Sequence, residues 1–300
     1  MALVFCLLGT TVPLTALAAG EDGEVQYIVS NDGTTLTIQG DGEITSQALN
    51  ANVTAEQKKT LTSVEIGAGV TGIADGYSSV FPAGVTNVTL KGSGAFRFGK
   101  YSFKGQKNLT VQSERTSLAI GSYAFHNAVL TEFPMDQLHT IGSYGFSNAV
   151  LPLEGETLTL RIEDQVDVEA QYPAISVGSC AFSGVKNKEG TAFSKASVTI
   201  GGTVQFGDYS FNASDVFGSS AALEELTFHL KEGAYLIFGG GALGIPALRS
   251  AVFTGTGQID FQHPSYRYVQ AAPFRNGKQV ETLDFSGFTG EITFAKNMFH

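Results

Sequence analysis

Two short patterns of apolar and polar positions alternate along most of this chain. In the first, apolar residues are separated by two variable positions and then by one, as in Leu61-Thr-Ser-Val64-Glu-Ile66. Its last three positions alternate apolar, polar, apolar, which predicts a β-strand with one buried face. The second pattern is a hexad of an apolar residue, glycine, any residue, often tyrosine, a small residue and phenylalanine, as in Ile120-Gly-Ser-Tyr-Ala-Phe125. We expect its glycine to permit a tight turn and its phenylalanine to fold back into the core.

The two patterns interleave as nine copies of each. Further hexads begin at Phe98, Ile141, Val177 and Phe206, and weaker ones at Ile73, Phe238, Val269 and Phe294. A single unit of about 25 residues cannot bury its own apolar face, so successive units must stack. The pattern therefore predicts a mostly β solenoid with short helical or 3-10 turns. A closed barrel, or long helices between the strands, would contradict this prediction.

This alternation resembles the BspA-like family of bacterial surface leucine-rich-repeat proteins, in which a strand precedes an I-G-x-x-A-F signature. The segment from Leu61 to Ile73 looks like the family's strand and connecting segment. Tyr27 to Ser46 is similar to the β-hairpin that often precedes its first repeat, with a turn at 31–33. The resemblance implies an N-terminal β-hairpin and capping region over 19–58 and a leucine-rich-repeat solenoid over 59–300. It also implies an exported bacterial protein that acts in adhesion.

The N-terminus carries an apolar stretch over residues 1–18 that ends in Ala16-Leu17-Ala18. Small residues at these spacings predict a secretory signal peptide that is cut after Ala18, although no Lys or Arg precedes the apolar run. An uncleaved membrane anchor is the alternative, but Gly9 and Pro13 make the stretch a poor spanning helix. Cleavage would leave a secreted or cell-surface protein with no embedded membrane domain. Only Cys180 would remain, and it has no intramolecular disulfide partner.

At the other end, the chain stops at Met298-Phe299-His300, directly after a hexad and without a polar cap. Stacked repeats need capped ends to stay soluble. We therefore expect the sequence to be a shortened piece of a longer chain.

The net charge of −10, from 18 Lys and Arg against 28 Asp and Glu, excludes nucleic acid as an expected partner. A nucleic-acid surface needs concentrated positive charge, and the sequence has no basic cluster. The 36 glycines mark the turns and the 22 phenylalanines fill the core of the expected stack.

Candidate chemistry is sparse, and we expect no catalytic residue, metal site or cofactor. The five histidines have no metal-ligand spacing, and the sequence carries no nucleophile elbow, phosphate loop or dinucleotide fingerprint. Cys180 occupies the hexad position that tyrosine holds elsewhere, which favours a structural residue over a nucleophile. The acidic run from Glu163 to Glu169 lacks the spacing of a Ca²⁺ loop, which favours a solvated loop.

The outward positions of the predicted strands suggest a binding surface. The residue between the last two apolar positions points away from the core, and in five of nine units it is threonine. These candidate ligand-binding residues are Thr89, Thr110, Thr159, Thr199 and Thr227. In a leucine-rich repeat this column lies on the concave face, where partners dock. The alternative is that threonine is simply a good solvent-facing strand residue.

Two units are enlarged, at 161–176 and 254–268, and we expect both segments to protrude as loops or hairpins. The second contains Tyr266, Arg267 and Tyr268, and tyrosine and arginine are enriched in binding hot spots. We take these three residues as a second candidate contact site.

The sequence thus predicts a non-enzymatic, exported binding or adhesion protein whose partner is an extracellular or host protein or glycan. A passive spacer within a larger surface protein is the alternative. A β-solenoid glycan-active enzyme is a more distant one, since no carboxylate or basic cluster repeats along one face.

Overall fold

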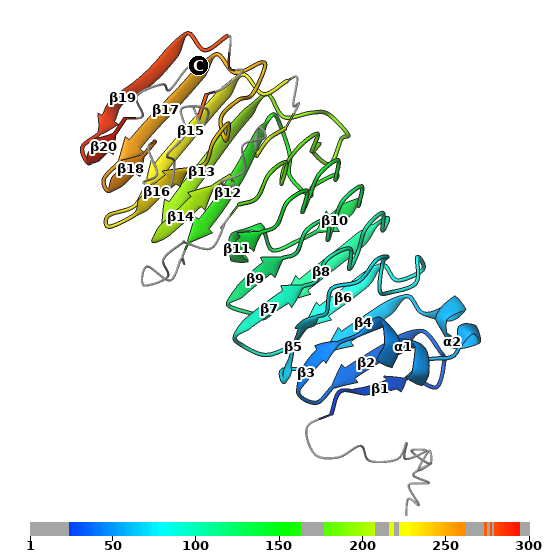
Figure 1. The fold of residues 1–300 in the computed structure, drawn as a ribbon. Coiled ribbons are helices and arrows are strands. Elements are labelled where there is room, and N and C mark those ends of the chain that lie inside the picture. Colours follow the sequence, from blue (N-terminus) through cyan, green and yellow to red (C-terminus); the bar gives the residue numbers. More distant parts are fainter. Residues whose placement is uncertain are drawn as a thin grey trace, which may run out of the picture.

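The computed structural model describes residues 24–163, 177–207, 216–218, 222–261, 273–274, 277 and 279–294. Over these residues the chain is mostly β, with few helices and several parallel sheets, and no sheet closes into a barrel. Figure 1 shows the strands stacked along one long axis, from the blue N-terminal part to the red C-terminal part. The predicted mostly β class is confirmed, and the described part of the chain contains no long helix between strands.

From β2 to β12, and again from β13 to β20, successive strands alternate between two stacks, each made of two sheets. The first stack contains β1 (Gln26–Val29), β2 (Thr35–Gln39), β4 (Ser63–Ile66), β6 (Asn87–Leu90), β8 (Leu109–Ser113) and β10 (Leu130–Glu132), then β12 (Thr157–Glu163), β13 (Lys195–Gly201), β15 (Glu225–Leu230), β17 (Ser250–Gly255) and β19 (Thr282–Phe288). The second contains β3 (Gly42–Ile44), β5 (Val70–Ile73), β7 (Ala95–Phe98), β9 (Ser117–Ile120) and β11 (Leu138–Ile141), then β14 (Thr203–Phe206), β16 (Tyr235–Phe238), β18 (Gln258–Asp260) and β20 (Glu291–Thr293).

The second stack was not predicted from the sequence. Six of its nine described strands end at the apolar residue that opens a hexad, as β7 does at Phe98 and β9 at Ile120. Parallel bridges from Ile141 to Val177 and from Val177 to Phe206 connect its two sheets. Where a first-stack strand is followed by β5, β7, β9, β11, β14 or β16, the hexad begins at the last residue of that second strand.

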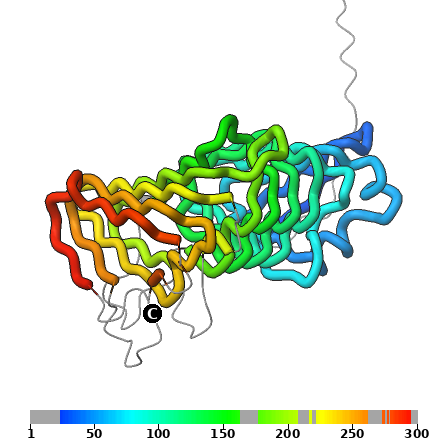
Figure 2. The backbone as a smooth tube through the Cα atoms, turned by 90° about the horizontal axis from the view of Figure 1, so that it is seen from above, coloured from blue at the N-terminus to red at the C-terminus, as the bar shows by residue number. Residues whose placement is uncertain are grey.

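Backbone hydrogen bonds between successive hexads form a third ladder. The Phe103 amide donates to the Ala124 carbonyl, Phe125 to Gly145 and Phe146 to Ala181, at 2.8, 2.8 and 2.9 Å. Figure 2 follows the backbone along the stack and shows these turns repeating beside one another. The hexads thus stack with the same pitch as the strands, and this repeats their side chains at regular intervals.

The hexad glycine allows close approach between units. Gly207 also takes the left-handed turn conformation, with φ of 85°, but Gly99, Gly121, Gly142 and Gly178 do not. A Cβ atom on Gly121 would lie 2.7 Å from the Phe98 carbonyl oxygen and 2.8 Å from the Lys100 nitrogen. The left-handed conformation instead falls on the fourth residue of the hexad, with φ of 59° at Tyr123. Gly99, Gly142 and Gly178 meet the preceding unit in the same way.

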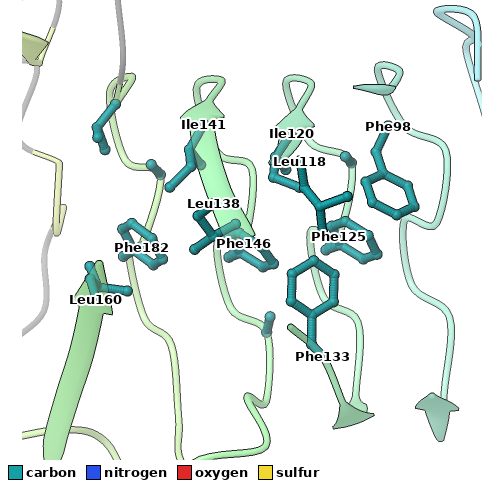
Figure 3. Close-up of a cluster of buried hydrophobic side chains, with 14 of the residues drawn as sticks. Phe98, Leu118, Ile120, Phe125, Phe133, Leu138, Ile141, Phe146, Leu160 and Phe182 are labelled. Carbon is teal, nitrogen blue, oxygen red and sulfur yellow. The ribbon is translucent and has the colours of Figure 1, made fainter. Parts of the chain in front are cut away.

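The hexad phenylalanines fill the core, as predicted. Phe103, Phe125, Phe146 and Phe182 stack in sequence, with ring centroids 5.6, 5.3 and 5.6 Å apart. Figure 3 shows Phe125 and Phe146 pointing into the interior, beside Leu118 of β9, Leu138 of β11 and Phe133, which follows β10. This continuous apolar column runs through the middle of the molecule.

The N-terminal end begins with the antiparallel pair β1–β2, located where the sequence predicts a hairpin. Two short helices follow, α1 (Ser46–Asn52) and α2 (Ala55–Thr60). Thr45 caps α1 by accepting a hydrogen bond from the Ala48 amide, and Thr54 and Gln57 form a capping box on α2. Helix α2 extends two residues beyond 58, the end of the predicted capping region.

A buried arginine ties three units together. Arg115, which follows β8, is 3 % exposed and donates to the carbonyl oxygens of Gly67, Ala68 and Val70, two strands away. Its guanidinium lies over the Phe96 ring at 5.4 Å. Burial lowers the pKa of Arg115. The carbonyl oxygens accept hydrogen bonds from both terminal nitrogens of the guanidinium, while its buried Nε has no partner among the described residues.

The two enlarged segments are partly strand, which corrects the expectation that they protrude. Residues 161–163 complete β12, where Ile162 pairs with Ile200 and is buried. Residues 254–255 complete β17, and Gln258–Asp260 forms β18. Their alternating burial extends the ladder of the preceding strand. Residues 164–176 and 262–268 of these segments lie outside the described residues, as does the predicted signal peptide at 1–18.

Candidate binding surfaces

The predicted threonine column is divided between two rows of the first stack. In the N-terminal sheet Thr89 pairs with Glu65 on one side and Gln112 on the other. Thr110 instead pairs with Asn87 and lies in the neighbouring row, where its Oγ1 is 2.8 Å from that of Thr131.

The C-terminal sheet divides the remaining threonines in the same manner. Thr159 and Thr227 share a row, with Ser197 between them. Thr199 lies in the next row, between Arg161 and His229. The two rows are offset by two residues along each strand. Because side chains alternate between the two faces of a sheet, an offset of two keeps all five threonines on the outward face. Thr159 is exposed and the other four are half-buried.

One predicted member of the column is not in a strand at all. The run from Leu130 to Met135 follows the first apolar pattern, which predicts a strand at Phe133–Met135 with Pro134 pointing outward. The strand β10 ends at Glu132, and Pro134 precedes the 3-10 turn η1 (Met135–Gln137). Proline lacks the amide hydrogen that a ladder needs, which explains the early end.

The outward face of β12, β13, β15, β17 and β19 is broad and rich in hydroxyl groups. One row reads Thr159, Ser197, Thr227, Val252 and Asp284, and the next reads Arg161, Thr199, His229 and Thr254. His229 Nδ1 lies 2.9 Å from Thr254 Oγ1. At one side Lys195 pairs with Glu156 and Glu225, at 3.2 and 3.5 Å. Charged groups at this side thus pair with one another.

The second candidate contact site, Tyr266, Arg267 and Tyr268, lies outside the described residues.

A further surface emerges from the hexads: the tyrosine ladder, formed by Tyr101, Tyr123 and Tyr144. The rings stack with centroids 5.2 and 4.7 Å apart and interplanar angles of 27° and 8°. All three residues have left-handed backbones, with φ of 65°, 59° and 60°. The sequence showed the recurring tyrosine but gave no sign that the rings touch, because this depends on the pitch of the stack.

Cys180 continues the tyrosine ladder at one end, also with a left-handed backbone, φ 54°. A hydrogen bond with Cys180 raises the pKa of Tyr144, while burial is the main cause that raises the pKa of Tyr123. Both phenols therefore remain protonated hydrogen-bond donors at neutral pH. Cys180 lies in a hexad turn, where the repeat pattern predicted it.

Other chemistry is limited in the part of the chain that the structure describes. There, no three His, Cys, Asp or Glu side chains gather to hold a metal ion. An apolar hollow of about 370 Å³ is lined by Leu158, Phe182, Phe193, Phe217 and Leu223, with Asn148 and Lys186 among its few polar neighbours. It offers apolar contact but no acid–base pair. None of the described helices has both the length and the apolar character to cross a membrane.

A tyrosine–aspartate pair on the second stack makes a pH-dependent contribution to stability. The Tyr235 hydroxyl donates to Asp260 Oδ2 at 3.1 Å, and burial, with the nearby Asp260 charge, raises the pKa of Tyr235 from 10.0 to about 12. Because the fold favours the protonated phenol, this stabilisation is present below pH 10 and is lost as the pH rises towards 12. Urea unfolding should therefore show native protein losing more stability than Tyr235→Phe across this interval. Equal losses of unfolding free energy in the two proteins would show that the Tyr235–Asp260 pair is not the source of this pH dependence.

Comparisons with known proteins give no family assignment. No family model matches the chain. No curated protein matches it, and no solved structure does so either.

Proposed function

We propose that this chain is a leucine-rich-repeat solenoid of the BspA-like kind. Two features of the fold support this proposal. Strands alternate between two parallel stacks with a hydrogen-bonded hexad after the second strand, and a continuous phenylalanine column fills the interior. Each unit buries its apolar side chains against the adjacent units, which is the physical basis of repeat folds.

The function we propose is non-catalytic binding of an extracellular protein or glycan, as in adhesion, by a secreted or cell-surface protein. The observation that carries it is the outward face of β12, β13, β15, β17 and β19, with two aligned rows of mostly uncharged side chains that bear hydroxyl groups. Such a face makes many small polar contacts over a wide area. It has few aromatic anchors, so a single chain should bind with modest affinity.

A passive spacer is the second candidate, favoured by the elongated stack in Figure 1. An elongated, self-supporting stack can hold another domain at a distance without binding anything. The two proposals differ in whether the outward face of the C-terminal sheet has a partner.

Surface-plasmon resonance on the chain without residues 1–18, against panels of extracellular matrix proteins and neutral glycans, tests the proposal. Thr159→Ala/Thr227→Ala should weaken binding about tenfold, which corresponds to 1.4 kcal/mol. Thr203→Ala/Thr293→Ala, on the second stack, is the matched control and should bind like the native chain. A Tyr266→Ala/Tyr268→Ala variant tests the second contact site.

The outcomes separate the candidates. No binding across the panel would favour the spacer. Binding that the first threonine pair does not change would remove the C-terminal sheet as the contact surface, and turnover of a glycan would overturn the non-catalytic proposal.

A further inference from the structure

The hexad turn takes a left-handed backbone at its fourth residue, but it does not require a tyrosine there. Tyr101, Tyr123 and Tyr144 are bulky residues with left-handed backbones, which L-residues adopt only at a cost in energy. The hexad that begins at Phe238 has Gly241 at the same position, with φ of 70° and no such cost. Sparsely populated conformations of this kind cluster at functional sites. The phenol side chains are therefore candidates for a role beyond closing the turn.

The tyrosine ladder presents hydroxyl groups rather than ring faces to a ligand. The two sides of Tyr123 are covered by its neighbours' rings, and all three rings are half-buried. Within the described part of the chain, the Tyr101 and Tyr123 hydroxyls have no hydrogen-bond partner, and neither is a buried, unsatisfied atom. These two hydroxyl groups are accessible donors and acceptors in a row along the stack.

Two lysines give one end of the tyrosine ladder a positive charge. The Nζ atoms of Lys100 and Lys104 each lie 5.1 Å from the Tyr101 ring centroid. Among the described residues, neither ammonium group is in an ion pair, whereas Lys91 and Lys195 are. Asp75 lies near Lys100 but is paired with Arg97. In a chain with a net charge of −10, two ammonium groups outside ion pairs, beside uncharged hydroxyls, favour a ligand with negative charge.

The spacing of the rings distinguishes two classes of acidic polymer. Side chains on one side of an extended peptide recur about every 6.6 Å, twice the rise per residue. The ring centroids are 5.2 and 4.7 Å apart, so a peptide would lose register along the row. An extended chain of pyranose sugars advances by about one strand spacing per ring, so each sugar would meet one phenol.

We propose that the tyrosine ladder, with Lys100 and Lys104, binds a linear carboxylated glycan that lies along the stack. The phenol hydroxyls bond the sugar hydroxyls, and the two ammonium groups pair with a sugar carboxylate at the Tyr101 end. This site is on the hexad side of the molecule and is separate from the threonine rows. Its failure would leave the proposed binding at the C-terminal sheet unaffected.

Isothermal titration calorimetry on the chain without residues 1–18 tests the proposal with three probes: a β-1,4-linked oligoglucuronate, a cello-oligosaccharide of the same length, and oligoglutamate. The oligoglucuronate should bind, the neutral sugar should bind about tenfold more weakly, and oligoglutamate should bind more weakly than the acidic sugar. Tyr101→Phe/Tyr123→Phe keeps the stacked rings and removes two hydroxyls. It should weaken oligoglucuronate binding about tenfold.

Lys100→Gln/Lys104→Gln should remove the preference for the acidic sugar. The matched control is Lys58→Gln/Lys59→Gln in α2, which changes the net charge equally and should retain that preference. Thermal unfolding of every variant confirms that the fold is intact. The proposal would be overturned if oligoglucuronate did not bind, or if oligoglutamate bound more strongly than it. It would also be overturned if both lysine variants lost the preference for the acidic sugar equally, or if the tyrosine variant bound oligoglucuronate like the native chain.

Discussion

Gly121→Ala is expected to lower the free energy of unfolding by about 3 kcal/mol. The new Cβ would lie 2.7 Å from the Phe98 carbonyl oxygen, 2.8 Å from the Gly99 carbonyl carbon and 2.8 Å from the Lys100 nitrogen. All three are backbone atoms of the preceding unit, so no flexible side chain can move aside. The units would have to separate at this point, and the hydrogen bond from the Gly121 amide to Phe98, at 2.7 Å, would lengthen.

Gly76→Ala is the matched control, because a Cβ there meets its nearest atom at 3.4 Å, an ordinary contact. It should change stability by no more than about 0.5 kcal/mol. Urea unfolding of both variants, followed by far-ultraviolet circular dichroism, gives the comparison. Equal effects would mean that the preceding unit yields easily, and that close approach does not explain the recurring glycine.

This glycine illustrates what the sequence could and could not predict. The recurrence of glycine and phenylalanine was enough to predict stacked units with a phenylalanine core, and Phe125 and Phe146 are fully buried as expected. Why glycine recurs at this position could not be predicted from the sequence, because the reason is the distance between one unit and the next. A single chain pattern shows what recurs within a unit and says nothing of that distance.

The second stack shows a different limit. Its strands have visible alternation, for example Phe96-Arg97-Phe98 in β7, where both phenylalanines are buried. Strands of three or four residues show too few alternations for a clear period. The stronger hexad pattern begins at the last residue of such a strand, so the strand itself was not recognised as a separate element. The alternation was therefore present in the sequence, but it was not separated from the hexad that follows it.

Register limited the prediction of the candidate site. Thr199 was aligned with Thr159 through the apolar pair Val198 and Ile200, although the structure pairs these with Leu160 and Ile162. Both alignments give the same alternation, since a shift of two residues leaves every side chain on its own side. Pattern alone therefore places a threonine on the correct side of the sheet without fixing its row.

The tyrosine ladder could be predicted only as a recurring residue. The stack of the rings depends on the pitch of the hexads, and the positive charge at one end comes from Lys100 and Lys104, which belong to one unit alone. Because the two lysines occur in only one unit, a search for features that repeat in every unit does not find them.

Phe125→Ala is expected to have the largest effect of any single substitution discussed, a loss of about 3–5 kcal/mol. The ring is fully buried and stacks on Phe103 and Phe146, at 5.6 and 5.3 Å. It also meets Phe98 and Phe133 edge-on, at 5.0 and 5.1 Å. Truncation would leave a cavity bounded by rings from both neighbouring units, and the backbone ladder prevents those units from closing it.

Tyr77→Ala is the matched control, since Tyr77 is 100 % exposed and its truncation should cost less than about 0.5 kcal/mol. Hydrogen exchange of the native state then shows how far the cavity acts. If units depend mainly on their neighbours, amides of β7, β9 and β11 should lose protection while those of β15 and β17 keep it. A uniform loss along the whole chain would mean that the stack unfolds as one cooperative body, and a loss no larger than that of Tyr77→Ala would show that the phenylalanine column does not stabilise the stack.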